Sequence, residues 1–181
     1  MRYCNQCGQP VEIKVPCGDN LPRYVCTNCE AVHYENPRIV AGCVCEWKGQ
    51  ILLCKRAIEP RLGFWTIPAG FMEKGETTAQ AAARETSEEA NAQVSIDALF
   101  AMINVPHIDQ VHLMFRGRLI DGNYSPGLES EVVLLADRTK IPWDEIAFPS
   151  VKFTLERYLE DLDKNVFGMH VTDIAPKNRV A

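Results

Sequence analysis

Two pairs of cysteines near the N-terminus, each spaced Cys-x2-Cys, limit what this part of the chain can form. The pairs are Cys4 with Cys7 and Cys26 with Cys29. Their spacing is typical of sites in which four thiolates surround one zinc ion. About forty residues cannot bury a stable core, so a bound ion would supply folding free energy directly. We therefore expect a small domain over residues 1–36 that holds a structural Zn²⁺.

Other uses of the cysteines fit less well. A Cys-x2-Cys pair also occurs in thiol exchange, but neither pair precedes a helical pattern. Four thiolates leave no open position for water, which a catalytic zinc requires. Cys17 could act as a substitute ligand, but its position between Pro16 and Gly18 favours an ordinary loop thiol. The other three lie in apolar runs and are interpreted as small buried side chains: Cys43, Cys45 and Cys54.

The composition narrows the class of protein. A chain of 181 residues suits one main domain with a small additional one. No apolar run has the length of a membrane span and the N-terminus lacks a secretion signal, so we expect a cytoplasmic protein that does not bind membranes. The net charge of -5 makes nucleic acid an unlikely partner for the surface as a whole. An anionic substrate would therefore need local cations.

The main domain is expected to follow the break at Asn36-Pro37, to cover residues 37–165, and to end in a C-terminal tail over 166–181. The tail has little periodicity and includes the sequence APKNRVA, which we expect to be loosely ordered. Lys48-Gly49 indicates a hairpin turn. Five runs have a strand pattern: 38–47, 50–57, 95–105, 109–120 and 130–136.

Two helices are predicted in this domain. Thr77 and Gln80 match a capping box, an alanine-rich run follows, and Asn91 can end a helix, which predicts a helix over 78–90. The second helix follows Ser150 as its predicted N-cap. Its apolar residues recur at helical spacing: Val151, Leu155, Tyr158, Leu159 and Leu162.

The first predicted helix carries three glutamates on one face. Glu85, Glu88 and Glu89 stand at positions i, i+3 and i+4, where like charges oppose helix formation by a few tenths of a kcal/mol per pair. A hard cation such as Mg²⁺ or Mn²⁺ would remove this repulsion and keep positions open for water and phosphate oxygens. A solvated acidic face is the alternative interpretation.

The residues around these glutamates resemble the Nudix box, G-x5-E-x7-R-E-(apolar)-x-E-E-x-G-(apolar). Three positions depart from it, because Asn91 replaces the last glycine, Thr86 is only half apolar and Ala92 is small. The resemblance is close in the box and loose from Arg38 to Asp161. The six specified positions are filled by Gly70, Glu76, Arg84, Glu85, Glu88 and Glu89.

This resemblance implies an α/β fold, a Nudix α/β/α sandwich around a mixed sheet, after an N-terminal segment that is similar to a zinc ribbon. It also implies hydrolysis of a small-molecule nucleoside diphosphate linked to another moiety, with Mg²⁺ or Mn²⁺. A homodimer is compatible with it. The chain lacks the motif S-Q-P-W-P-F-P-x-S of the NADH pyrophosphatase branch and is closer to FAD or ADP-ribose pyrophosphohydrolases.

The resemblance further implies roles for individual residues. Glu85 and Glu89 are expected as direct metal ligands, Glu88 as a direct or water-mediated one, and the Ala69 carbonyl as a further one. Arg84 and Glu76 are expected to form a pair that orients a glutamate, and Gly70 to allow a close backbone approach. The candidate general bases are Glu85, Glu129 and Glu131.

Other residues near the box have less specific interpretations. Arg56 and Arg61 flank the loop before the box and could meet phosphate, although lone arginines usually lie on solvated surface. His107 and His112 are interpreted as structural or incidental. Trp65 is interpreted as packing the loop beneath the site, with base stacking as the weaker alternative. A nucleotide-sensing or nucleic-acid- or protein-binding module, with a zinc ribbon and a non-catalytic Nudix fold, is the alternative function. An isomerase of this fold is a third option with little specific support.

Overall fold

The chain forms two compact units, Met1–Pro37 and Arg38–Ala181. The computed structural model describes residues 1–176. The last five residues of the predicted tail lie outside this range. None of the helices within 1–176 is both long enough and apolar enough to cross a membrane.

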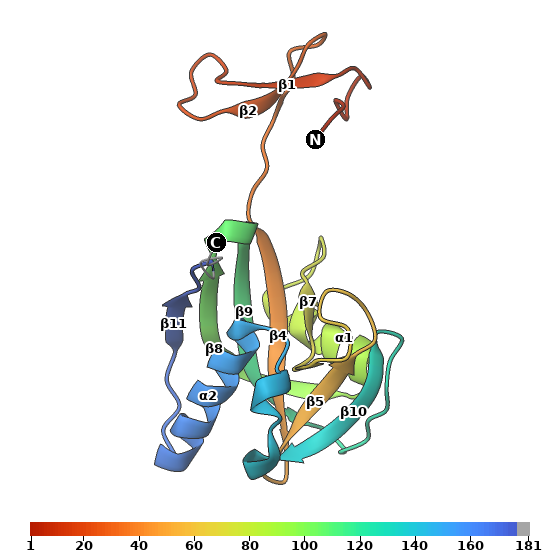
Figure 1. The fold of residues 1–181 in the computed structure, drawn as a ribbon, viewed down its shortest axis with the longest axis vertical. Helices are drawn as coiled ribbons and strands as arrows, with labels where there is room; N and C mark the ends of the chain where they lie inside the picture. Colours follow the sequence, from red (N-terminus) through yellow and green to blue (C-terminus); the bar gives the residue numbers. More distant parts are fainter. Residues whose placement is uncertain (177–181) are drawn as a thin grey trace. The chain divides into compact units, whose positions relative to one another are not determined.

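The first unit contains a small antiparallel sheet in the order β1-β2-β3 (Figure 1). Its buried residues are Cys4, Val25, Cys26 and His33. Two of these four are predicted zinc ligands, so the described part of this unit has almost no apolar core of its own. The strands are β1 (Val11–Lys14), β2 (Arg23–Cys26) and β3 (Val32–His33).

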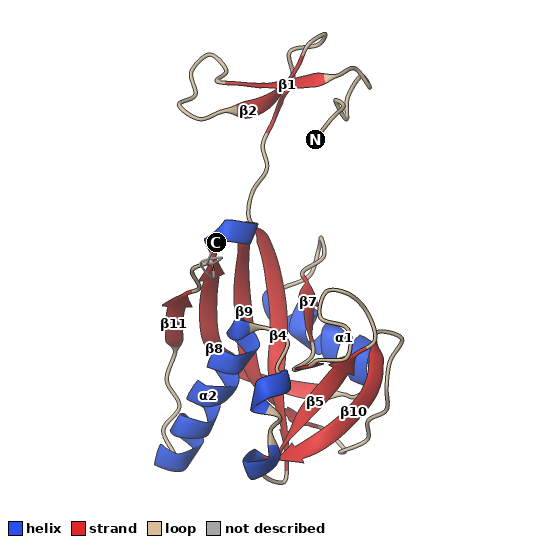
Figure 2. Cartoon of the chain, in the orientation of Figure 1, coloured by secondary structure: helices blue, strands red, loops and turns tan. Residues whose placement is uncertain are grey.

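The second unit is built on one mixed sheet of eight strands (Figure 2). The main path runs β10-β5-β4-β9-β8-β11, while β6 pairs with β5 and β7 pairs with β4. The pairs β4–β9 and β8–β11 are parallel, and the others are antiparallel. The strands are β4 (Arg38–Trp47), β5 (Gln50–Arg56), β6 (Trp65–Thr66), β7 (Ala69–Phe71), β8 (Val94–Val105), β9 (Gln110–Leu119), β10 (Ser130–Asp137) and β11 (His170–Asp173).

Two α-helices cover opposite faces of this sheet (Figure 1). Ala81, Ala82 and Ala90 of α1 pack in one apolar cluster with residues of β4 and β5. Leu155 and Tyr158 of α2 belong to a second cluster on the other face. This confirms the predicted α/β/α sandwich around a mixed sheet. The helices are α1 (Thr78–Ala90) and α2 (Pro149–Lys164), and short 3-10 turns are η1 (Pro106–Ile108), η2 (Arg138–Lys140) and η3 (Trp143–Glu145).

The structure confirms most predicted elements and corrects two. The predicted helix over 78–90 and the five strands are present, and Lys48 and Gly49 form the β4–β5 turn with φ of 50° and 83°. The N-cap of α2 is Phe148, not Ser150, because the helix already begins at Pro149, whose fixed φ suits a first helical position. The segment predicted as a tail contains β11, which extends the sheet beside β8.

Candidate active site

Helix α1 begins and ends as its sequence predicts. The hydroxyl of Thr77 accepts a hydrogen bond from the N–H of Gln80 at 3.2 Å, and the Gln80 side chain accepts one from the N–H of Thr77 at 2.8 Å. Asn91 ends the helix with a φ of 45°, a conformation that asparagine tolerates. These two caps fix where the helix begins and ends, and the packing of Ala81, Ala82 and Ala90 on the sheet sets the face on which its glutamates lie.

Arg84 is the centre of a group of carboxylates on α1 and the loop before it. Its guanidinium donates to both carboxylate oxygens of Glu76, at 3.0 and 2.9 Å, which confirms the predicted pair. The same side chain donates to Glu85 at 2.7 Å and Glu88 at 2.8 Å. The Arg84 hydrogen bond lowers the pKa of Glu76, and Glu76 is the largest cause that raises the pKa of Arg84. One arginine thus orients two of the three helix glutamates.

Gly70 lies directly against Glu85. Strand β7 pairs with β4, with Gly70 opposite Ala41, and this pairing holds the backbone of Gly70 beside α1. A Cβ atom at this position would overlap the carboxyl group of Glu85. The absence of a side chain at Gly70 therefore leaves room for that carboxylate. This agrees with the close backbone approach that we expect at Gly70 from the sequence.

Glu89 is the most buried of the three helix glutamates, with 6% of its surface exposed. Burial and then the charge of Glu85 raise the pKa of Glu89 to about 8, whereas the Ala69 N–H and the charge of Arg56 oppose this rise. Burial also raises the pKa of Glu85, and Arg84 opposes it. Two neighbouring carboxyl groups that are costly to ionise suit a bound cation, because its charge offsets both burial and their repulsion.

The three helix glutamates differ in their neighbours and in their exposure. Glu85 and Glu89 are close enough to affect each other, while Glu88 is bound to Arg84 and has 59% of its side chain exposed. Within residues 1–176, the only group of at least three potential ligand residues with ligand atoms all within 4.8 Å of one another is the four cysteines. The carboxylate chemistry suits Mg²⁺ or Mn²⁺. The ligand roles of Glu85, Glu88, Glu89 and the Ala69 carbonyl stay predictions.

A loop before β10 packs on the C-terminal end of α1. The N–H of Gly127 donates to the carbonyl of Glu89 at 3.0 Å, and a Cβ at Gly127 would overlap the carbonyl oxygen of Glu88. Asn91 donates from its amide to the carbonyl of Pro126 at 2.9 Å. No local pattern marks Gly127, since its contact partners lie more than thirty positions away in the sequence.

The two downstream candidates for the general base differ in their surroundings. The negative charge of Glu129 raises the pKa of both Glu85 and Glu89, so it acts on the carboxylate group. Glu131 instead forms an exposed ion pair with Lys55 at 3.3 Å. This charge effect on both helix glutamates, and the pairing of Glu131 with Lys55, favour Glu129 over Glu131 as the candidate base.

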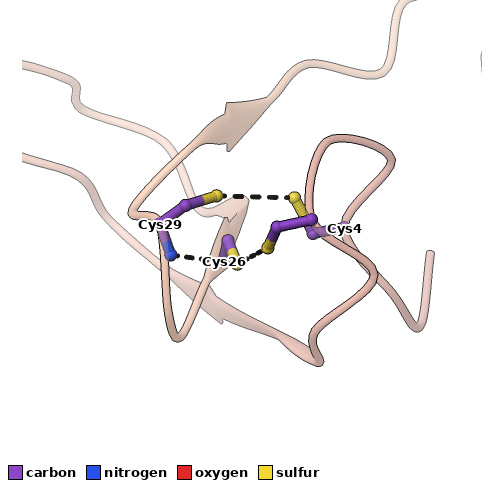
Figure 3. A group of neighbouring side chains, drawn as sticks. Cys4, Cys26 and Cys29 are labelled. Atoms are coloured by element: carbon purple, nitrogen blue, oxygen red, sulfur yellow. Dashed lines mark hydrogen bonds between the residues drawn. The ribbon is translucent and has the colours of Figure 1, made fainter.

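The first unit brings the four predicted zinc ligands together. The sulfur atoms of Cys4 and Cys29 lie 3.7 Å apart (Figure 3). Those of Cys7 and Cys26 lie 3.4 Å apart. Zn–S bonds of about 2.3 Å in a tetrahedron require sulfur separations of about 3.8 Å, so this set fits zinc. Cys17 does not belong to the group.

His33 is a neighbour of these cysteines that sequence reasoning missed. The buried His33 ring places Nε2 3.3 Å from Cys4 Sγ. A ring N–H beside a thiolate can fix its orientation, as hydrogen bonds around metal ligands commonly do. The only signal in the sequence is a histidine four positions after Cys29.

Solved structures include one that resembles almost the whole chain. A crystal structure of a NUDIX hydrolase from Nitrosomonas europaea is 47% identical, with a TM-score of 0.91, and the match covers 96% of this chain and 100% of that one. This match includes both units. The fold and the N-terminal cysteine domain therefore occur together in a solved structure.

Curated relatives match parts of the chain. An ADP-ribose pyrophosphatase from Methanocaldococcus jannaschii is 28% identical over 66% of this chain and 72% of its own length. The NAD-capped RNA hydrolase NudC from Edwardsiella ictaluri is 36% identical over 51% of this chain. That match spans only 34% of the NudC sequence, about a third of its length.

Two family models match consecutive parts of the chain. The Nudix N-terminal zinc-ribbon model matches residues 2–35, which contain all four cysteine ligands. The NUDIX domain model matches residues 35–160, from the start of the sheet to α2, and so includes the whole Arg84-centred group. The chain therefore belongs to the NUDIX domain family and carries its N-terminal zinc ribbon.

Proposed function

We propose that this chain hydrolyses the diphosphate linkage of a nucleoside diphosphate joined to another moiety, of the FAD, ADP-ribose or NADH type. The observation that carries the proposal is the carboxylate group around Arg84, with Glu85 and Glu89 half-buried or buried against β7. Two relatives are named an ADP-ribose pyrophosphatase and an NAD-capped RNA hydrolase. The molecules in these names contain the same class of diphosphate linkage, which supports the proposal.

Each residue of the group has a proposed task. When bound at these carboxylates, Mg²⁺ or Mn²⁺ would activate a water molecule and offset the charge of the diphosphate. Glu85 and Glu89 would hold the ion directly, with Glu88 and the Ala69 carbonyl as additional ligands. Arg84, fixed by both oxygens of Glu76, keeps the Glu85 carboxylate oriented. Positioning and charge neutralisation are what this type of reaction most requires.

A substrate panel tests the proposal. The protein is incubated with FAD, NADH, ADP-ribose, dinucleoside polyphosphates, nucleoside triphosphates and an NAD-capped RNA, with Mg²⁺ or Mn²⁺, and products are separated by chromatography. Cleavage of a diphosphate linkage supports it. If all remain intact with both ions, the hydrolase proposal is wrong. Tight nucleotide binding without cleavage would instead support a nucleotide-sensing or binding module.

Glu129→Gln is expected to lower kcat by about 10²-fold or more, because general bases typically contribute a factor of 10²–10⁴. Glu131→Gln is the matched control, two positions away, and is expected to change kcat by less than about twofold, since its exposed pair with Lys55 contributes little. The measurement is kcat at saturating substrate and Mg²⁺. If Glu131→Gln lowers kcat and Glu129→Gln does not, the assignment of Glu129 as the general base is wrong.

Gly70→Ala is expected to lower kcat/KM by roughly 10²-fold, because the new methyl group displaces the carboxylate of Glu85. Gly168→Ala is the control, since a Cβ there meets nothing within 4 Å. Steady-state kinetics and thermal unfolding are measured for both variants. Full activity in a folded Gly70→Ala would show that the position of Glu85 does not matter for turnover.

Several expectations from the sequence stay predictions. These are the homodimer, the cytoplasmic location, the low importance of nucleic acid as a partner, and the domain limits at residues 36 and 165. Gel filtration with light scattering measures whether the protein forms the homodimer. The panel above measures whether an RNA-linked diphosphate is cleaved better than a free one.

A further inference from the structure

The loop before β10 carries Glu129 and buries none of its own residues. We call residues 123–129 the Glu129 loop. Each of them is exposed or half-buried, and Leu128 has 99% of its surface exposed. A segment with few buried apolar contacts opens at a low cost in free energy, so its hydrogen bonds largely decide where it lies. The place of Glu129 therefore depends on the bonds that this loop makes.

The side chain of Asn91 makes two of these bonds. Its amide nitrogen donates to the carbonyl oxygen of Ser125 at 3.3 Å and to that of Pro126 at 2.9 Å. The NH₂ group of an asparagine has two donors, and both are used here. One side chain at the end of α1 thus holds two consecutive residues of the Glu129 loop.

The backbone at the end of α1 holds the same loop. The carbonyl oxygens of Ala90 and Glu89 accept hydrogen bonds from the N–H groups of Ser125 at 2.9 Å and Gly127 at 3.0 Å. Both carbonyls are among the last four of the helix, which have no partner within it. A Cβ at Gly127 would overlap the carbonyl oxygen of Glu88, so the loop approaches the helix closely. The amide of Asn91 therefore adds to a joint that already exists.

The other end of the Glu129 loop is fixed to the sheet. The N–H of Ala57, directly after β5, donates to the carbonyl of Glu129 at 2.8 Å. The N–H of Ser130, the first residue of β10, donates to the carbonyl of Gly127 at 3.2 Å. Glu129 therefore lies between two fixed points, one at the end of α1 and one at the end of β5. Loss of the first would leave the loop attached only at the second.

The charge of Glu129 reaches the helix carboxylates. Burial is the largest cause that raises the pKa of Glu85 and of Glu89, and the charge of Glu129 adds to it in both. A charge effect falls with distance, so it depends on where the loop lies. A general base must also stay within hydrogen-bond reach of the water that it activates. A loop held at both ends meets this need better than one that moves.

Asparagine combines two properties that position 91 requires for this contact. The residue ends α1 with a φ of 45°, which glycine and asparagine adopt more readily than other residues. The Nudix box has glycine at this position, and glycine has no side chain to reach the loop. An ionised aspartate has the right shape but no N–H donor. The departure from the box therefore keeps the helix end and adds two bonds to the loop.

We propose that Asn91 is a positioning residue for the reaction, because its amide holds the Glu129 loop on α1 and thereby keeps Glu129 beside the helix carboxylates. The proposal rests on the proposed function and on Glu129 as its general base. Asn91 itself acts only through Glu129.

Asn91→Gly tests the amide without changing the backbone conformation. We expect kcat to fall about tenfold, the factor by which the loss of two neutral hydrogen bonds shifts a local equilibrium, and KM to change much less. Asn165→Gly is the matched control, since Asn165 ends α2 with a φ of 53° and caps it through its backbone N–H, which glycine keeps. It should retain full activity. Tm is measured for both variants, and a similar Tm shows that both stay folded.

A double-mutant cycle shows whether Asn91 acts through Glu129. In a protein that already carries Glu129→Gln, the further change Asn91→Gly should alter kcat by less than about twofold, because the base that it positions is gone. A purely structural role would lower kcat by the same factor in both backgrounds. That result would overturn the proposal, and so would an undiminished kcat in folded Asn91→Gly.

Hydrogen exchange gives a readout that needs no substrate. The amides of Ser125 and Gly127 are followed by NMR in the zinc-containing protein, and Asn91→Gly should speed their exchange about tenfold, whereas Asn165→Gly should not. Unchanged exchange in Asn91→Gly would mean that its amide does not hold the loop, which would overturn the proposal even if the wild type cleaves a substrate. Faster exchange in a protein that cleaves nothing on the panel would keep the contact and remove the hydrolase.

Discussion

Glu89→Gln is expected to lower metal-dependent turnover by about 10³-fold while the protein stays folded. The amide has the shape of the carboxyl group but cannot contribute a negative charge to a bound Mg²⁺ or Mn²⁺. A loss of about 4 kcal/mol in transition-state stabilisation, typical for weakened metal catalysis, corresponds to this factor. The fold should not suffer, because burial and the charge of Glu85 already favour the neutral form of Glu89, which the glutamine amide matches in charge and shape.

Two measurements check this result. The first is kcat on the best substrate of the panel over a range of Mg²⁺ concentrations, and the second is thermal unfolding, where Tm should be unchanged or raised. Glu156→Gln, on α2 at the opposite face of the sheet, is the control and should keep full activity. Undiminished turnover in Glu89→Gln would remove Glu89 from the proposed metal site and most of the support for the mechanism.

Helix α1 could be predicted to the residue because everything that defines it lies within fifteen positions. The capping box of Thr77 and Gln80, the alanine run and Asn91 are local signals, and the structure does not override them. The Arg84–Glu76 pair was predictable for the same reason, since two turns of helix and a short loop separate its partners. The Nudix pattern then added the identity of the fold.

The start of α2 could not be predicted in the same way. Ser150 is a good N-cap residue in isolation, but Pro149 before it is equally good as a first helical residue. In the structure the Ser150 hydroxyl lies 3.0 Å from Nδ1 of His112, thirty-eight positions earlier, and the helix begins at Pro149. A contact at that distance in the sequence leaves no local signal.

Strand β11 was missed for a related reason. It has only four residues, and its partner β8 ends more than sixty positions earlier. Isolated runs this short carry too little periodicity to identify a strand. The hydrogen bond from Asn104 to Asp173 at 2.7 Å and the contact of His170 with Asp161 at 2.8 Å hold the segment in place.

The site shows the same division between local and distant information. Glu85, Glu88 and Glu89 share a helix face, as their spacing requires, but their unequal burial depends on β7 and on the loop with Gly127. The sequence offered Glu129 and Glu131 as equal candidates for the base. Their surroundings in the folded chain distinguish them, because the charge of Glu129 raises the pKa of Glu85 and Glu89 whereas Glu131 pairs with Lys55.

Loss of the zinc site is the second change with a large expected effect. Cys26→Ser is expected to abolish stoichiometric zinc binding and to unfold the first unit, Met1–Pro37. Structural zinc contributes about 10–16 kcal/mol of apparent binding free energy in small zinc domains, and a unit with almost no other buried residues has nothing to replace it. The second unit has its own two apolar clusters, so it should keep its fold.

Hydrogen exchange read by mass spectrometry, together with zinc analysis, measures both units at once. In Cys26→Ser, amides of β1 and β2 should exchange as in an unfolded chain, whereas those of β4 and β5 should keep their protection. Cys17→Ser is the control, because Cys17 is exposed and outside the cysteine group, and it should retain one zinc per chain. Protected β1 and β2 amides in a zinc-free Cys26→Ser protein would mean that the first unit folds without metal, against the argument from its missing core. Lost protection in β4 and β5 would mean that the second unit depends on the first for its stability.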